Sequence, residues 1–141
     1  MPFGLPEALH EVVNAKEGYV AATGTLTFDE TQLPKVDMKR QNETPPTSRV
    51  KARMSGTSLG ESGFSHRFDT PLSLEILCYG PWCAGALSGK TVLAFLKETP
   101  AGYTVTSTPC GGHIFYEPSK AILETVARCY LKGACPKLER N

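Results

Sequence analysis

Short stretches of the chain alternate apolar and polar residues with a period of two, which is typical of β-strands that have one buried face. Between them lie clusters of glycine, proline, serine and other polar residues, which favour turns. A mainly β fold is therefore expected. The predicted strands are residues 18–28, 49–55, 64–68, 72–76, 91–96 and 102–105.

The strand predicted at residues 18–28 carries a glycine, Gly24, on its apolar face. A glycine inside a strand often marks a bulge or a tight bend. A kink or bulge is therefore expected at this position. The other apolar residues of that face are Val20, Ala22, Leu26 and Phe28.

The strand predicted at residues 49–55 has three basic side chains on one face and three apolar ones on the other. A row of cations can contact a phosphate backbone, but a solvated strand face is the simpler interpretation. The glycine- and serine-rich residues 56–63 then predict a turn that joins this strand to residues 64–68 as a hairpin. The apolar residues are Val50, Ala52 and Met54, and the basic ones are Arg49, Lys51 and Arg53.

Residues that are typical of helix starts and helix ends occur near both ends of the chain. Pro6 and the spaced apolar residues after it predict a short N-terminal helix that ends near Lys16. A second helix is predicted over residues 120–132, where Ser119 or Glu117 can cap the first amides. Gly133, followed by a proline, ends this helix.

The second helix has a distinct apolar stripe. Glu124 and Arg128 are four residues apart on the outer side and are expected to pair. Cys129 falls near the buried edge, which suits a disulfide better than exposure to solvent. The stripe consists of Ile122, Leu123, Val126, Ala127 and Tyr130.

Residues 29–48 form a long polar loop with several prolines, and loops of this length are commonly functional or mobile. The 141 residues amount to one domain, covering residues 1–141, with enough chain to bury a core. The 15 basic and 14 acidic residues nearly balance, so no nucleic-acid partner is expected. No apolar run approaches the roughly 20 residues of a membrane-spanning helix.

Five cysteines, all after Leu77, are many for a reduced domain of this size. Their odd number leaves one thiol unpaired or paired outside the chain. We therefore expect an extracytoplasmic protein, either periplasmic or secreted. Residues 1–6 lack the basic and apolar regions of a signal peptide, so such a leader is expected to precede residue 1.

Two motif matches lack the context that their chemistry needs. Residues 56–60 (Gly-Thr-Ser-Leu-Gly) fit G-x-S-x-G, but a turn is predicted where the nucleophile elbow needs a helix. Residues 78–83 (Cys-Tyr-Gly-Pro-Trp-Cys) are similar to thioredoxin-type sites. Four residues separate the sulfurs instead of two, and no helix begins there to lower a thiolate pKa. A structural disulfide, or simple proximity in a turn, is the better interpretation.

Cysteines and a histidine in this part of the chain are also possible metal ligands. Cys78, Cys83, Cys110 and His113 could offer three sulfurs and a nitrogen to zinc, but their spacing is atypical. We expect no metal and no cofactor. His10 and His66 have no serine or carboxylate at a recognisable spacing, so both are interpreted as surface or half-buried polar residues.

Residues 68–135 resemble the netrin-like (NTR) module, the family that includes the N-terminal domains of tissue inhibitors of metalloproteinases. The similarity lies in the order of a Cys-Ala-Gly turn at Cys83, the strand 91–96, a glycine turn, the strand 103–105, Cys110, and a helix that leads into Cys135. That family folds as a five-stranded OB-type barrel with terminal helices at one side. The resemblance implies the same architecture here.

The chain departs from that family at its start. In the inhibitors an N-terminal Cys-x-Cys pairs with the cysteines that match Cys83 and Cys110, and its free amine chelates the protease zinc. No cysteine precedes Cys78 here, so inhibition by that route is not expected. The resemblance implies that Cys83 and Cys110 could bond to each other. Cys129 with Cys135, or Cys78 with either of them, would then form a second bridge, since connectivity cannot be read from sequence.

The first functional hypothesis is a non-catalytic binding or interaction module whose ligand, a protein or a small molecule, the sequence does not identify. The loop 29–48 and the turn 79–90 are the expected contact regions. Tyr79 and Trp82 lie on this turn, and exposed aromatic residues commonly anchor interfaces. The alternative for Trp82 is that it caps the core.

The second hypothesis is a small thiol-disulfide redox protein that uses Cys78, Cys83 or Cys110. One reactive thiol of low pKa would favour it, whereas two disulfides and one inert thiol would favour the module. Oligonucleotide binding by the OB face is a third and weaker idea, because the chain lacks a stripe of basic and aromatic residues.

Overall fold

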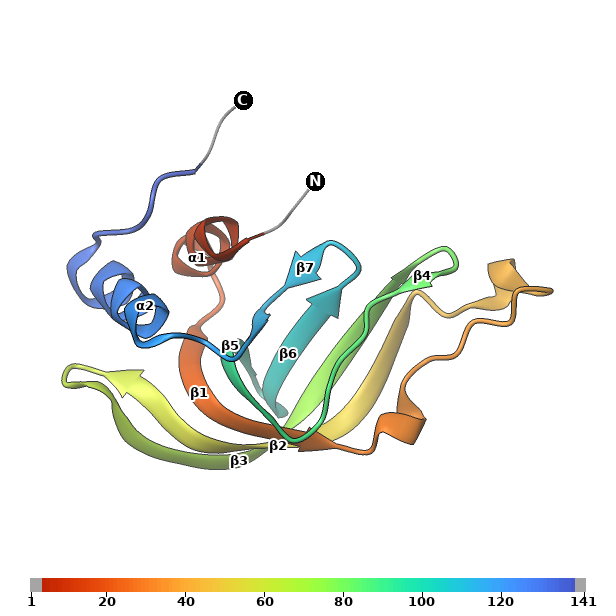
Figure 1. Cartoon of the computed structure of the whole chain (residues 1–141), viewed down its shortest axis with the longest axis horizontal. Coiled ribbons are helices and arrows are strands. Elements are labelled where there is room, and N and C mark those ends of the chain that lie inside the picture. The colour runs from red at the N-terminus through yellow and green to blue at the C-terminus, as the bar shows by residue number, and fades with distance from the viewer. Residues whose placement is uncertain (1–3, 139–141) are drawn as a thin grey trace.

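The computed structural model describes residues 4–138, which form eight strands and two α-helices (Figure 1). The predicted mainly β fold with a helix near each end is therefore confirmed. The helices are α1 (Leu5–Asn14) and α2 (Lys120–Lys132). The strands are β1 (Tyr19–Phe28), β2 (Thr47–Gly60), β3 (Gly63–Tyr79), β4 (Trp82–Cys83), β5 (Lys90–Thr99), β6 (Gly102–Thr108), β7 (Gly111–Gly112) and β8 (Ile114–Tyr116).

Five of the strands pair in a closed ring in the order β1, β2, β3, β6, β5 and back to β1. Four of these pairings are antiparallel. The fifth, between β3 and β6, is parallel and runs from Leu72 opposite Tyr103 to Ile76 opposite Ser107. The short strands β4, β7 and β8 pair with β3, β6 and β5.

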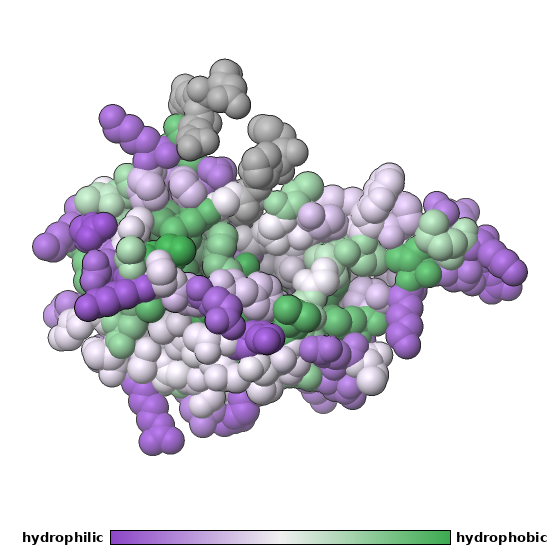
Figure 2. Space-filling view, in the orientation of Figure 1, coloured by the Kyte–Doolittle hydropathy of each residue, from purple (hydrophilic) through white to green (hydrophobic). Residues whose placement is uncertain are grey.

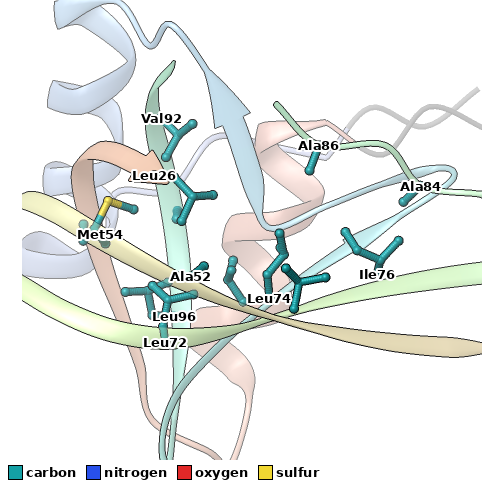
Figure 3. Packing of buried hydrophobic residues seen from close by; sticks show 14 residues of the cluster. Leu26, Ala52, Met54, Leu72, Leu74, Ile76, Ala84, Ala86, Val92 and Leu96 are labelled. Atoms are coloured by element: carbon teal, nitrogen blue, oxygen red, sulfur yellow. The ribbon is translucent and has the colours of Figure 1, made fainter. Parts of the chain in front are cut away.

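The inside of the ring is filled by apolar side chains that alternate along the strands. Leu26, Met54, Leu74 and Leu96 come from four different strands and gather in this core, where each is fully buried (Figure 3). Burial of one such side chain contributes roughly 1.5–3 kcal/mol. The predicted faces of residues 49–55 are confirmed, since Val50, Ala52 and Met54 are buried and Arg49, Lys51 and Arg53 are exposed.

The two helices pack side by side against the outer surface of β1 and β5 (Figure 1). They bury a second apolar cluster there, in which Phe95 stacks on Tyr130 with an interplanar angle of 7°. Strand β5 is therefore covered on both faces, which explains why residues 92–96 are apolar without alternation. The helix residues of this cluster include Ala8, Leu9, Val12, Val126 and Cys129.

The bounds of α2 match the prediction because its stop signals are local. Ser119 Oγ accepts a hydrogen bond from the amide of Ile122 at 3.2 Å, and Gly133 ends the helix with a φ of 69°. The predicted pairing of Glu124 with Arg128 is wrong. Arg128 Nη2 donates to the hydroxyl of Thr125 at 3.4 Å instead.

The predicted hairpin of β2 and β3 is confirmed, but its turn is much shorter than expected. Residues 61 and 62 alone form the turn, and the predicted strands 64–68 and 72–76 are one strand of 17 residues. Gly56 lies inside β2, opposite Gly24 of β1. A Cβ on either glycine would meet the backbone of the other strand, so both positions serve a close strand contact and not a turn.

Of the kink or bulge predicted at Gly24, the bulge does not occur. The register of β1 with both of its neighbours continues unbroken through this residue. The irregularity lies in β2, where the pairing with β3 shifts between Ser58 and Leu59. Ser58 therefore lies within a strand, without the helix that a G-x-S-x-G nucleophile requires.

Candidate functional site

Three connecting segments line an open hollow of about 620 Å³ at the end of the ring away from the helices. They are the β1–β2 connection, the β3–β4 turn with the residues after it, and the β6–β7 turn. We call this feature the Trp82 hollow. Its lining is largely apolar and includes Leu33, Pro34, Val36, Pro81, Trp82 and Pro109.

The β1–β2 connection is held in place where it leaves the ring. Asp29 Oδ1 accepts hydrogen bonds from the hydroxyl of Thr31 at 2.6 Å and from its amide at 3.0 Å, and these bonds lower the pKa of the Asp29 carboxyl. Glu30 Oε2 accepts from the amide of Ser88 at 2.7 Å, just before β5. These contacts fix the first part of the connection, which carries Leu33 to the hollow.

The far part of the same connection is strongly hydrophilic. Figure 2 shows hydrophobic surface beside this hydrophilic tip, at the right-hand end of the molecule. Arg40 and Glu43 form a loose ion pair of 3.8 Å on the tip, and both side chains are mostly exposed. The predicted loop 29–48 therefore forms a rim of the hollow with an apolar inner side and a charged outer side.

The β3–β4 turn presents both predicted contact residues. Tyr79 and Trp82 are cross-strand partners, so Gly80 and Pro81 alone make the turn. Gly80 has a φ of 63°, which glycine adopts without strain at the first central position of a tight hairpin turn. The disulfide between Cys78 and Cys83 joins the next pair of residues inward.

The exposure of Trp82 decides between its two predicted roles. Its surface is 72% exposed, so the interpretation that it caps the core is wrong. Tyr79 is 49% exposed, yet it borders a separate cavity of about 190 Å³. The two aromatic residues thus share a turn but face different hollows, and contact with a ligand stays a prediction for both.

The cysteines pair differently from the arrangement that the resemblance implied. Cys78 bonds to Cys83 and Cys129 bonds to Cys135, while Cys110 is free and exposed on the β6–β7 turn. The expected bridge between Cys83 and Cys110 is wrong, because the hairpin register places Cys83 directly opposite Cys78. Cys78 and Cys83 therefore have no thiolates to offer to zinc.

Buried His113 makes a contact that sequence reasoning missed. Its Nε2 lies 2.6 Å from Glu11 Oε1, which links α1 to the segment between β7 and β8. Its ring also meets Tyr19 and Phe95 edge-on, at centroid distances of 5.4 and 6.3 Å. The partners are 102 residues apart in the chain, so no local spacing could have revealed the pair.

The other two histidines lie away from the Trp82 hollow. His10 Nε2 is 2.8 Å from the carbonyl oxygen of Pro136, and His66 is exposed on β3. Both agree with the prediction of surface or half-buried positions. His113 and His10 each tie a terminal helix to another segment, so the polar contacts at the helices hold the fold together.

Comparisons of the chain with protein-family models, with curated proteins and with solved structures found no match. Over residues 4–138, neither helix has the length and apolar character needed to cross a membrane.

Proposed function

We propose that this chain is a non-catalytic binding module that holds a partner at the Trp82 hollow. The exposed indole of Trp82 carries this proposal. Tryptophan is among the residues most enriched at the energetic centres of interfaces, where truncation to alanine often costs about 2 kcal/mol or more. Here it stands at the rim of a hollow with apolar walls, where a partner can bury it.

The hollow is suited to an apolar segment of a protein partner. Pro34, Pro81 and Pro109 line it, and proline has a fixed φ. The neighbouring turn is closed by the Cys78–Cys83 disulfide, and Glu30 anchors the opposite wall to Ser88. A rigid hollow loses little conformational freedom when it binds, which favours affinity.

We also propose an extracytoplasmic location and an OB-type barrel of the NTR kind. The two disulfides support the location, because such bonds persist mainly in oxidising compartments. The closed ring of five strands, with both helices packed together on one side, supports the barrel.

The test uses the fact that Trp82 is the only tryptophan of the chain. A partner recovered from an extracytoplasmic fraction on the immobilised chain should change the fluorescence of the free chain on titration. Calorimetric titration, which does not need the indole, should show that Trp82→Ala weakens binding of this partner at least tenfold, because the indole would be the partner's main apolar contact. Leu131→Ala, which removes an exposed side chain of α2, should leave binding unchanged. A partner that binds the Trp82→Ala chain as tightly as the original would refute the proposal.

The alternative of a thiol-disulfide protein has one favourable observation, the exposed free thiol of Cys110. This thiol borders the same small cavity as Tyr79 and His113. Against it, Cys78 and Cys83 close a hairpin and no helix begins there to stabilise a thiolate. Rapid alkylation of Cys110 near pH 6, where an ordinary thiol of pKa about 8.5 hardly reacts, would favour the alternative.

A further inference from the structure

A second open hollow, of about 660 Å³, lies on the outer surface of β2, β3 and β6 and reaches the end of β5. The helices cover the outer surface of β1 and β5 but leave this part of the ring bare. We call the hollow the basic groove. The residues that matter for its chemistry are Arg49, Lys51, Ser73, Glu75, Lys97 and Thr104.

The strand register places four of these residues in one row across the sheet. Lys51 is opposite Ser73, Ser73 is opposite Thr104, and Thr104 is opposite Lys97. Neighbouring strands lie about 4.8 Å apart, so the row spans roughly 14 Å. All four side chains point outward because the flanking residues are buried in the ring, namely Val50, Ala52, Leu72, Leu74, Leu96 and Val105.

The row therefore presents two hydroxyl groups between two ammonium groups. Arg49 adds a third cation one step along β2, opposite the carboxylate of Glu75. Three cations and one carboxylate leave this surface with a net charge of +2, whereas the whole chain carries only +1. The lining of the groove thus carries a local excess of positive charge.

The cations of the groove are available to a ligand. Arg53, the next basic residue on the same face of β2, is already bound to Asp69 at 2.7 Å. Arg49 and Lys51 have no salt bridge to any residue within 4–138. Lys97 Nζ is 3.9 Å from Glu17 Oε1, a partly exposed pair worth at most about 1 kcal/mol, so an anion can displace it.

We propose that the basic groove binds an acidic polysaccharide. Arg49, Lys51 and Lys97 would hold its sulfate or carboxylate groups, and Ser73 and Thr104 would bond its sugar hydroxyls. The cations stand at separate points along the groove, which suits a chain of spaced charges better than one small anion. An extended polyanion also gains from the release of its bound counterions.

Single-stranded nucleic acid fits this surface less well. Proteins that bind it stack the bases on exposed aromatic side chains. Tyr103 is the single aromatic residue among those that line the groove, and its ring packs edge-on against Phe68 at 5.2 Å. Hydroxyl groups, and not stacking surfaces, separate the two lysines.

The experiment measures binding of the full chain to heparin, a sulfated polysaccharide, at salt concentrations from about 50 to about 200 mM. Affinity should fall steeply with salt. The Lys51→Gln/Lys97→Gln variant should bind roughly tenfold more weakly and lower the salt slope by about two, since each lost contact lowers it by about one. Glu75→Gln should strengthen binding, because it removes the one carboxylate of the groove.

Two controls separate this result from general charge effects. Lys132→Gln removes an exposed cation at the end of α2 and should leave heparin binding unchanged, while Lys51→Arg/Lys97→Arg should retain it. The proposal fails if Lys132→Gln weakens binding as much as the groove variant. It also fails if single-stranded DNA of equal charge displaces heparin completely, which would assign the groove to nucleic acid. Binding at the Trp82 hollow shares no lining residue with the groove, so either proposal can fail alone.

Discussion

Gly24 and Gly56 show how single residues determine the shape of the ring. They lie opposite each other on β1 and β2, at a point where the two backbones approach so closely that no Cβ fits. Gly24 lies two residues from Leu26, which is fully buried in the core of the ring. Glycine is needed here for space between strands, and not for an unusual backbone angle.

Replacing Gly56 by alanine should destabilise the fold by roughly 2–3 kcal/mol. The added methyl group would meet the carbonyl of Thr23 and force β1 and β2 apart. Urea unfolding measures this as a lower midpoint with an unchanged slope. Gly85→Ala is the matched control, because a Cβ at Gly85 meets nothing within 4 Å. Equal stability of the two variants would contradict the close contact.

Tyr130 makes the stability of the fold depend on alkaline pH. Its phenol is packed against Phe95, and burial raises its pKa well above the usual 10. Below about pH 10 the phenol is protonated in both the folded and the unfolded chain, so its contribution is constant. As the pH rises further, the unfolded chain loses the proton and the folded chain keeps it, so stability falls by up to about 1.4 kcal/mol per pH unit.

The prediction is that Tyr130→Phe flattens this alkaline decline. Between about pH 9.5 and about pH 11.5, the free energy of unfolding measured with a denaturant should fall less for Tyr130→Phe than for the original chain. Tyr79→Phe, which removes a half-exposed hydroxyl on the β3–β4 turn, is the control for loss of a phenol outside the core. If the free energy of unfolding falls equally with pH in the original chain and in Tyr130→Phe, the phenol ionises equally easily in the folded and the unfolded chain.

At the scale of elements, two disulfides close short loops at the end of β3 and at the end of α2. The Cys78–Cys83 disulfide joins paired residues of β3 and β4, and the Cys129–Cys135 disulfide ties the last turn of α2 to the segment that follows it. Loops this short give roughly 2 kcal/mol each on the chain-entropy model. A bridge from Cys83 to Cys110 would close a longer loop and gain roughly 3 kcal/mol, yet the hairpin register favours the local partner.

Peptide mapping without reduction should therefore recover Cys78 linked to Cys83 and Cys129 linked to Cys135. Alkylation of the denatured, unreduced chain should label Cys110 alone. A peptide that joins Cys83 to Cys110 would contradict the pairing and would support the arrangement implied by the NTR resemblance. Cys110→Ser should change neither bridge.

At the scale of the whole molecule, two apolar cores divide the surface into distinct regions. One core lies inside the ring, and the other lies between β1, β5 and the two helices (Figure 1). The helices cover the outer face of β1 and β5 and the hairpin end of β2 and β3, and the basic groove lies on the remaining outer face of β2, β3 and β6. The connections at the other end of the ring build the Trp82 hollow.

Local signals in the sequence predicted much of this arrangement. The alternation in residues 49–55 identified which side chains of β2 are buried, and Ser119 and Gly133 marked both ends of α2. The candidate contact residue Trp82 followed from its place on a short turn with glycine and proline. The sequence did not predict the length of the β2–β3 hairpin. Gly56 allows close contact with Gly24 of another strand, but within its own segment a glycine is typical of a turn.

The sequence by itself determined the two helices, the approximate positions of the five long strands and the buried face of residues 49–55, because these depend on residues that are close in the chain. Only the tertiary structure decided which strands are neighbours in the ring, which sulfurs meet and which cations share a groove. The row from Lys51 to Lys97 draws on four strands, and His113 finds Glu11 across 102 residues. Such pairings are set by packing of the whole chain around its two cores, and no local spacing encodes them.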